Sequence, residues 1–499
     1  MFNIIKLNEK DNVGIAPMPI PKTSKVNKNL IAKDNIPFGH KVSLVNINKG
    51  DYIYKYGQII GIASNNILIG EHVHSHNLVF KDFKRNYEIK AKHKINTIKS
   101  DLFFKGYKRK NGKGGTRNYI GLISTVNCSA TVVKRIAENI NNHLSKNNFQ
   151  NIDGAVCLKH SSGCGMNTSG YGMEIFNRTI EGFKNHVNFG KVFVIGLGCE
   201  CAQISLYEDN NEENKIEYMN IQDEGGTKEI IKKVTENIID NLDEINSIER
   251  TNIPISELTV ALQCGGSDSY SGITANPALG FASDLIVTHG GSTILSETPE
   301  IYGAEHLLIA RAQNSDLIKK INNQIKWWKD YTSINGGSLD NNPSPGNKKG
   351  GLTTILEKSL GAVAKSGSSD MINVLDYSEP ISLKGFNFMN SPGYDPVSVT
   401  GQVASGANII CFTTGRGSCF GFKPSPSIKI ATNTNMYNKL IEDMDINAGS
   451  IMDGESNIEK VGNEIFEKII SVASGNKPKS EINGYGDDEF NPWVIGATM

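Results

Sequence analysis

The chain has 499 residues, of which 38% are hydrophobic and 21% charged, so it is globular in composition but too long for one ordinary core. Its 52 Lys and Arg residues balance 52 Asp and Glu residues, which leaves no broad positive field to hold a nucleic acid or an anionic membrane surface. No apolar run reaches the roughly 20 residues of a membrane span, and we expect a soluble protein of several domains.

The N-terminus meets charged residues after a short apolar stretch and has no cleavage signal, which predicts a cytoplasmic location. Residues 41–78 then break into short β-prone runs separated by turn residues, as in a small all-β module. Residues 81–100 are polar and Lys-rich without a clear period, as in a linker or a solvated helix. We therefore end the first domain, residues 1–95, within this stretch.

Beyond the linker, apolar runs alternate with segments of helix length, which is the pattern of a parallel sheet covered by helices on both faces. The predicted strands span residues 119–125, 154–158, 192–197, 258–262, 285–288 and 408–413. A charged, Asn-rich segment interrupts the series and contains a predicted helix over 226–242. A second boundary near residue 250 gives α/β domains over 105–250 and 253–499.

Four cysteines, Cys128, Cys164, Cys199 and Cys264, follow predicted strands. Ligands of open α/β sheets bind beyond the carboxyl ends of strands, so these thiols are candidate ligands or nucleophiles. The alternative carries equal weight for each of them, because free cysteines commonly pack in cores. Their spacing does not fit a zinc ribbon, and eight cysteines in a cytoplasmic chain of this length do not indicate a disulfide framework.

His72, His74 and His76 alternate along the chain, and in a strand their imidazoles would share one face. Such a row could bind a metal or move protons, whereas an exposed edge strand with a polar face is the alternative.

Residues 294–306 hold the densest acidic cluster, at a predicted strand exit followed by a helix that starts after Pro299. Glu300 and Glu305 could simply favour the positive end of that helix. Glu297 lies at the strand exit and is the better candidate for a metal ligand or a base.

Arg416 follows another predicted strand and precedes Lys423, so both cations could hold a substrate carboxylate. Residues 342–351, rich in Gly, Pro and Asn, are too long for a tight turn. They indicate a binding loop or lid, with a flexible surface loop as the alternative.

Taken together, these motifs resemble those of the altronate dehydratase / galactarate dehydratase family over nearly the whole chain. The matching segments are Gly106-Tyr107-Lys108-Arg109, Gly115-Thr116-Arg117-Asn118-Tyr119, Cys264-Gly265-Gly266-Ser267-Asp268, residues 271–277, residues 296–306, residues 342–350, Glu357-Lys358-Ser359-Leu360-Gly361, Pro392-Gly393-Tyr394-Asp395-Pro396, Thr400-Gly401-Gln402 and residues 413–418. The β module is similar to the family's SAF-type β-clip domain, with His72-Val73-His74 and His76-Asn77 matching its histidine motif. The chain departs from the family pattern at Ser161, where a glycine is expected.

The resemblance implies a hydro-lyase that removes water from a sugar acid. Its fold would be α/β: an SAF-type β-clip domain, a middle domain used for dimerisation and a Rossmann-like catalytic domain. The implied cofactor is a divalent metal, iron(II) by preference and manganese(II) as the alternative, and the implied assembly is a homodimer. Length and the unsplit β module favour conversion of D-altronate to 2-dehydro-3-deoxy-D-gluconate, with galactarate or a related sugar acid as the alternative substrate.

Within this reading, we assign residues to three roles. The metal ligands would come from Cys264, Asp268, Glu297 and His306. The catalytic groups would be His72, His74 and Glu297, and the substrate contacts Ser267, Asn276, Arg416 and Lys423. Two rivals stay open: an iron–sulfur hydro-lyase that uses three of the four strand-end cysteines, and a sugar-acid-binding regulator without turnover.

Overall fold

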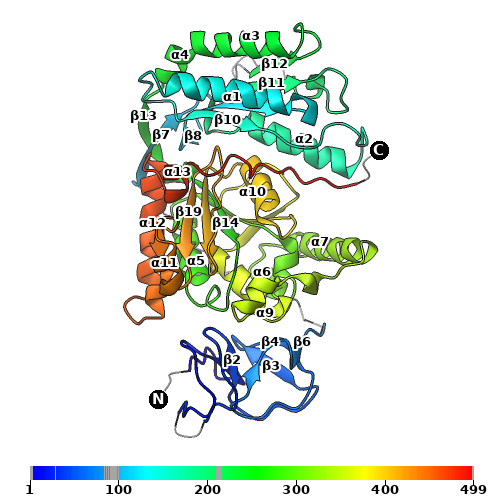
Figure 1. Cartoon of the computed structure of the whole chain (residues 1–499), viewed down its shortest axis with the longest axis vertical. Helices are drawn as coiled ribbons and strands as arrows, with labels where there is room; N and C mark the ends of the chain where they lie inside the picture. Colours follow the sequence, from blue (N-terminus) through cyan, green and yellow to red (C-terminus); the bar gives the residue numbers. More distant parts are fainter. Residues whose placement is uncertain are drawn as a thin grey trace.

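The computed structural model describes residues 4–27, 30–83, 85, 87, 89, 98, 100–208 and 216–496, and the predicted linker over 81–100 lies largely outside these residues. A small β module, a parallel-sheet domain and a second α/β domain are stacked along the long axis, with the C-terminal domain in the middle (Figure 1). The α/β fold with a leading all-β domain is thus confirmed. Among the described residues, no helix is both long and apolar enough to span a bilayer.

The N-terminal module consists of two three-stranded antiparallel sheets, ordered β1-β2-β5 and β3-β4-β6. Its strands are β1 (Val13–Ile15), β2 (Lys41–Ser43), β3 (Tyr52–Lys55), β4 (Gln58–Ala63), β5 (His72–Val73) and β6 (Leu78–Val79). The predicted histidine strand is wrong beyond Val73, where the chain turns. The Asn77 side chain causes this turn, because it accepts a hydrogen bond from the His74 amide (2.9 Å) and donates one to the His72 carbonyl (2.8 Å).

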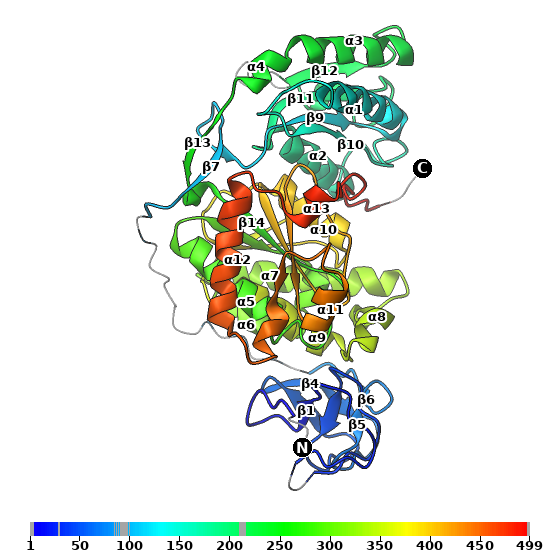
Figure 2. The same cartoon turned by 60° about the vertical axis from the view of Figure 1, so that its left-hand side comes forward.

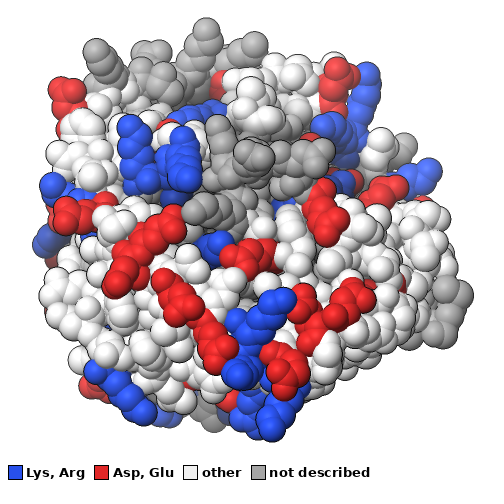
Figure 3. Space-filling view, turned by 90° about the horizontal axis from the view of Figure 1, so that it is seen from above, with Lys and Arg blue, Asp and Glu red and all other residues white. Residues whose placement is uncertain are grey.

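The middle domain has a parallel sheet in the order β10-β9-β11-β12, and the prediction of its first three strands is confirmed. Its elements are β9 (Tyr119–Ser124), α1 (Ala130–Leu144), β10 (Gly154–Leu158), α2 (Tyr171–Lys184), β11 (Phe189–Gly196), β12 (Ile216–Asn220), α3 (Thr227–Asp240) and α4 (Leu242–Asn246), with short 3-10 turns η1 (Asn127–Ser129) and η2 (Ile204–Leu206). The buried faces of α1 and α3 share one core with this sheet. Seen from this end of the molecule, the acidic and basic side chains of the described residues are interspersed (Figure 3).

A small antiparallel sheet, β13-β7-β8, joins the middle and C-terminal domains. Its strands are β7 (Phe103–Lys108), β8 (Gly114–Gly115) and β13 (Arg250–Pro254). Arg117, one of the family-like residues, is buried beside it and binds Glu481 of α13 (Lys479–Ile482) at 2.6 Å. This arginine therefore holds the two domains together.

The C-terminal domain is built on seven parallel strands ordered β16-β17-β15-β14-β18-β19-β20. The strands are β14 (Thr259–Cys264), β15 (Ser292–Leu295), β16 (Met371–Leu375), β17 (Phe386–Met389), β18 (Ile409–Thr414), β19 (Ser427–Ala431) and β20 (Ile446–Asn447). The helices are α5 (Ala275–Thr288), α6 (Glu305–Ile309), α7 (Ser315–Ile334), α8 (Pro345–Lys349), α9 (Ile355–Val363), α10 (Asp395–Ala404), α11 (Thr434–Lys439) and α12 (Ile458–Ala473), with 3-10 turns η3 (Ile255–Glu257), η4 (Thr298–Ile301), η5 (Leu339–Asn341), η6 (Ala364–Ser366) and η7 (Ala448–Ile451). Helices α5 and α12 pack together on one face, and α10 lies between the other face and α2 (Figures 1 and 2).

One predicted strand of this domain, residues 285–288, is wrong, because these residues form the last turn of α5. This helix is buried on most sides, so its apolar residues run together instead of showing a 3.6-residue period.

The β module is seated on the edge of the C-terminal domain where the central strands end (Figure 2). Ser269 donates to the Gly39 carbonyl at 2.5 Å, and Thr354 donates to the Ile60 carbonyl at 2.5 Å. Glu357 of α9 binds Lys41 and Lys55 of the module, both at 2.8 Å. These contacts place the module directly over the carboxyl ends of the sheet.

Candidate metal centre

The candidate site lies at the end of β14, where the order of the C-terminal sheet reverses. The chain goes from β14 to β15 on one side and later returns to β18 on the other side. In open parallel sheets, such a switch point leaves a crevice at the carboxyl ends of the strands, and ligands bind there. Cys264 is the last residue of β14.

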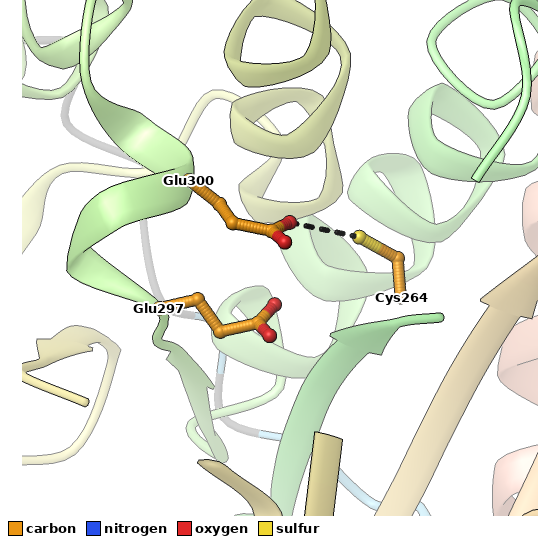
Figure 4. A group of neighbouring side chains, drawn as sticks. All are labelled: Cys264, Glu297 and Glu300. Carbon is orange, nitrogen blue, oxygen red and sulfur yellow. Dashed lines mark hydrogen bonds between the residues drawn. The ribbon is translucent and has the colours of Figure 1, made fainter. Parts of the chain in front are cut away.

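Cys264, Glu297 and Glu300 form a buried group in which one ligand atom of each lies within 4.8 Å of the others. Glu297 follows β15 in the left-handed conformation (φ 73°), and Glu300 lies on η4. The Cys264 Sγ is 3.9 Å from Glu300 Oε2, and both carboxylates point toward the thiol (Figure 4). A non-glycine residue with this φ is strained, so the turn that presents Glu297 is held at a free-energy cost.

Two buried lysines flank the group. Lys365 of η6 lies 2.9 Å from Cys264 Sγ and 3.8 Å from Glu297 Oε2. Lys358 of α9 binds Glu300 Oε1 at 2.7 Å, and Asn342 donates to the same oxygen at 2.6 Å. The lysines partly compensate the acidic groups in a place where unpaired charges would be costly.

The two glutamates differ in their protonation. Burial, and then the charge of Glu300, raise the pKa of Glu297 well above its ordinary value. Burial acts in the same direction on Glu300, but the charge and hydrogen bond of Lys358, together with Lys365 and Asn342, outweigh it and lower the pKa of Glu300. Burial raises the pKa of the Cys264 thiol to about 11, against the opposing effect of Lys365. Glu300 is therefore ionised at neutral pH, whereas burial favours the protonated form of Glu297 and the thiol form of Cys264 in the protein alone.

The group fits a divalent transition metal by its donor set, one sulfur and two carboxylates. Both oxygens of Glu297 are buried and accept no hydrogen bond from the described residues. A buried carboxylate in this state lacks the partners that would balance its desolvation, and a bound cation would provide them. The cation would displace the protons of Glu297 and Cys264.

The structure brings two of the four predicted metal ligands, Cys264 and Glu297, into this group and adds Glu300. The Asp268 carboxylate accepts hydrogen bonds from the backbone of Ser271 (2.9 Å) and from Thr432 (3.0 Å), which fix the loop after β14. His306 lies half-buried on α6 and is not part of the group.

The predicted substrate residues divide into two sets. Ser267 and Asn276 line a closed cavity beside Cys264. Arg416 is exposed, and Lys423 binds Asp487 at 2.6 Å, so neither residue lines this cavity.

The cavity measures about 10 Å³, which is room for no more than one water molecule. Its walls come from both domains, since Tyr56 of the β module lies opposite Cys264, Lys358 and the loop after β14. A ligand larger than a water molecule therefore needs a rearrangement of this interface to enter.

The imidazoles of His40, His72, His74 and His76 gather at the interface between the module and α8. The ring centroid of His72 lies 5.1 Å from that of His40, 5.5 Å from that of His74 and 5.3 Å from that of His76. The His40 Nδ1 is 3.0 Å from the His72 Nε2.

The His74 Nε2 contacts the Lys348 carbonyl of α8 at 2.9 Å. On the other side of α8, Asn347 contacts Lys358 at 3.4 Å, and Lys358 binds Glu300. In this chain of contacts, α8 lies between the predicted catalytic histidine His74 and the Glu300 carboxylate.

We expect the docking of the module to weaken in acid. Burial, and then the neighbouring histidines, lower the pKa of His72 to about 3 from an ordinary value of 6.5. Burial, and then the charge of Lys41, lower the pKa of His74 to about 4. The docked state therefore disfavours protonation, so its stability is full above pH 6.5 and falls as the pH drops toward 4. The melting temperature, measured from pH 7.5 to 4.5, should fall more steeply in the wild type than in a His72→Gln, His74→Gln variant. Equal slopes would contradict this expectation.

The sequence did not identify the residues that neutralise the group. Lys358 lies in a family-like motif, but its spacing from Glu300 in the chain gave no reason to pair the two. Lys365 and Tyr56 carry no local signal, because only the fold brings η6 and the β module to the end of β14.

Comparison with known proteins defines the class of this three-domain fold and its site. Residues 255–498 match the family model "D-galactarate/Altronate dehydratase, C-terminal". Residues 106–246 match "D-galactarate dehydratase/Altronate hydrolase, second domain" and residues 2–81 match "Altronate/galactarate dehydratase SAF domain". The class is therefore that of the sugar-acid dehydratases.

Three related proteins match this chain over most or all of its length. The chain is 34% identical to an altronate dehydratase of Bacillus subtilis, over 100% of both chains. It is 37% identical to a galactarate dehydratase (L-threo-forming) of Escherichia coli, over 95% of this chain and 93% of the relative. An altronate dehydratase of Escherichia coli is 33% identical over 96% and 97%, respectively. The chain belongs to the galactarate/altronate dehydratase family.

Proposed function

We propose that this protein removes water from a six-carbon sugar acid by abstracting the C2 proton and releasing the 3-hydroxyl. The reaction we favour converts D-altronate to 2-dehydro-3-deoxy-D-gluconate, with galactarate as the alternative substrate. The observation that carries the proposal is the buried Glu297 carboxylate, which accepts no hydrogen bond from the described residues and lies beside Cys264 and Glu300 at the switch point.

Abstraction of a proton next to a carboxylate is difficult because it adds negative charge to an anionic group. Cys264, Glu297 and Glu300 would hold a divalent cation, iron(II) by preference or manganese(II), which supplies Lewis-acid stabilisation of the substrate carboxylate and 2-hydroxyl. Lys365 and Lys358 are buried cations at the same place, and they would offset part of the charge that develops on the substrate.

The acid and base roles of His72 and His74 remain part of the proposal. Their lowered pKa values keep both imidazoles neutral at pH 7 in the closed arrangement, so there they could accept a proton but not donate one as an imidazolium. Both lie on the far side of α8 from the carboxylates, and the closed cavity is too small for the substrate. We propose that α8 and the β module separate to admit the substrate, which would also bring the histidines into reach.

Substrate contacts are proposed on the same basis. Ser267 and Asn276 already line the cavity, and the Ser267 hydroxyl is buried without a hydrogen-bond partner among the described residues. Arg416 and Lys423 would meet the substrate carboxylate only in the open arrangement. Assembly as a homodimer through the middle domain is likewise our proposal, which light scattering can test.

The decisive experiment is an anaerobic assay of the iron-loaded protein against a panel of aldonates and aldarates, followed by detection of the 2-keto product. We expect D-altronate to give the highest kcat/KM, by at least about tenfold over its stereoisomers, because hydroxyl contacts in a closed pocket discriminate strongly. Highest activity with galactarate would select the alternative. If the protein retains its metal and yet forms no product from any acid in the panel, the proposed function is overturned.

A further inference from the structure

Three exposed cysteines lie in loops at one edge of the middle domain. Cys128 lies on η1 after β9, Cys164 in the loop after β10 and Cys199 in the loop after β11. These strands are adjacent and parallel, so their loops leave the sheet at the same edge. Cysteine is among the most buried residue types, and an exposed trio at one edge is not explained by packing.

Backbone contacts hold the three loops together. Asn127, next to Cys128, donates from its amide to the Ser162 carbonyl at 3.0 Å. The amide of Cys201, in the loop of Cys199, donates to the Gly163 carbonyl at 3.1 Å. The loop that carries Cys164 therefore lies between the other two.

A glycine and a buried carboxylate fix this arrangement. Gly163 has a φ of +97°, and a Cβ at this position would lie 2.1 Å from the Thr125 carbonyl oxygen, so only glycine permits the close approach of the loop to the end of β9. Glu200 is buried and binds the amides of Leu197 (3.0 Å) and Gly198 (2.7 Å) and the Thr125 hydroxyl (2.7 Å). The loops are thus preorganised, while their thiols stay open to solvent.

The proposed catalytic group does not use these thiols, since Cys264 belongs to the neighbouring domain. We infer that Cys128, Cys164 and Cys199 form a second site, which binds an iron–sulfur cluster through three thiolates. Iron–sulfur clusters are held by cysteine thiolates, and in a four-iron cluster each thiolate binds a different iron. The exposed edge leaves the cluster accessible from solvent.

The test is anaerobic reconstitution of the full-length protein with iron(II), sulfide and a thiol reductant. The wild type should gain visible charge-transfer absorption, acid-labile sulfide and about three to four irons per chain beyond the ion of the carboxylate group. Cys128→Ser, Cys164→Ser and Cys199→Ser should each lose most of the sulfide. Two control variants should keep the sulfide. They are Cys264→Ser and Cys419→Ser, which changes an exposed thiol of the C-terminal domain.

Far-ultraviolet circular dichroism of each variant verifies that the loss of sulfide is not a loss of folding. A wild-type protein that binds no sulfide would overturn the inference. So would a wild-type protein that stays colourless and binds one zinc ion through the same three cysteines. A sulfide content that survives in the triple Cys→Ser variant would also overturn it. Because the readout is sulfide and iron content, the result does not depend on the proposed sugar-acid activity.

Discussion

Replacing Glu297 by Gln is expected to lower kcat by about 10²- to 10⁴-fold, the usual effect of removing a group that acts directly on the reacting atoms. The amide keeps the size of the side chain but cannot carry the negative charge that a cation requires. The bound metal, measured by elemental analysis after gel filtration, should fall in parallel with kcat. The strained backbone at this position (φ 73°) is unchanged by the substitution, so a loss of activity reports the carboxylate itself.

Glu305→Gln is the matched control, because Glu305 is a buried carboxylate of the same acidic segment with different partners. It accepts a hydrogen bond from Tyr87 at 2.7 Å and lies outside the Cys264 group. This variant should keep its metal and a kcat within a few-fold of the wild type. Equal losses in both variants, or a Glu297→Gln protein with full turnover, would remove Glu297 from the proposed site.

The metal affinity of the wild type should also rise with pH. Because burial raises the pKa of Glu297 and of the Cys264 thiol, both must release protons when a cation binds. A surface site made of carboxylates that are already ionised would show no such dependence near neutral pH, because it has no protons to release.

Much of the fold could be predicted from the sequence, because its signals are local. Apolar runs that end in Gly- or Cys-bearing loops correctly gave β10 (Gly154–Leu158) and, within a few residues, β9, β11, β14 and β18. The same reasoning placed Glu297 at a strand exit, where the structure has it. It failed for residues 285–288, since a helix buried on most sides has the same apolar run as a buried strand.

The composition of the site could be predicted only in part, because its residues meet through tertiary structure. Cys264 and Glu297 follow neighbouring strands, and the switch-point rule brings such ends together. Lys365 follows a helix that packs back over the same edge, and no spacing in the chain reports that contact. The histidines were expected on one face of a strand, but the side-chain amide of Asn77 bends the chain after Val73 and gathers them at a turn instead.

The interface that covers the site depends on one buried carboxylate. Glu357 is 0% exposed, as is Lys41, and the Lys55 side chain is 1% exposed. Its oxygens also accept hydrogen bonds from the Thr353 amide (3.0 Å) and hydroxyl (2.6 Å). Burial acts against ionisation, but the two lysines prevail and hold the pKa of Glu357 far below its usual range. Two ammonium groups therefore share one carboxylate where water cannot replace a lost partner.

Glu357→Gln should destabilise the docked module by about 3–5 kcal/mol, because it leaves two buried ammonium groups without their counter-ion. For a module of this size, the corresponding calorimetric transition should shift down by more than about 10 °C. Glu138→Gln, which removes an exposed partner of Arg135 on α1, should cost less than about 1 kcal/mol.

A variant that replaces all three charges, Lys41→Met, Lys55→Met and Glu357→Leu, separates the effect of an unpaired charge from that of lost packing. If the cost arises from the unpaired ammonium groups, the triple variant should recover most of the lost stability, since apolar residues of similar volume can replace a buried ion pair without loss. A triple variant as unstable as Glu357→Gln would show instead that the hydrogen bonds of Glu357 to Thr353 and of Lys41 to the Gly351 carbonyl (2.7 Å) hold the module in place.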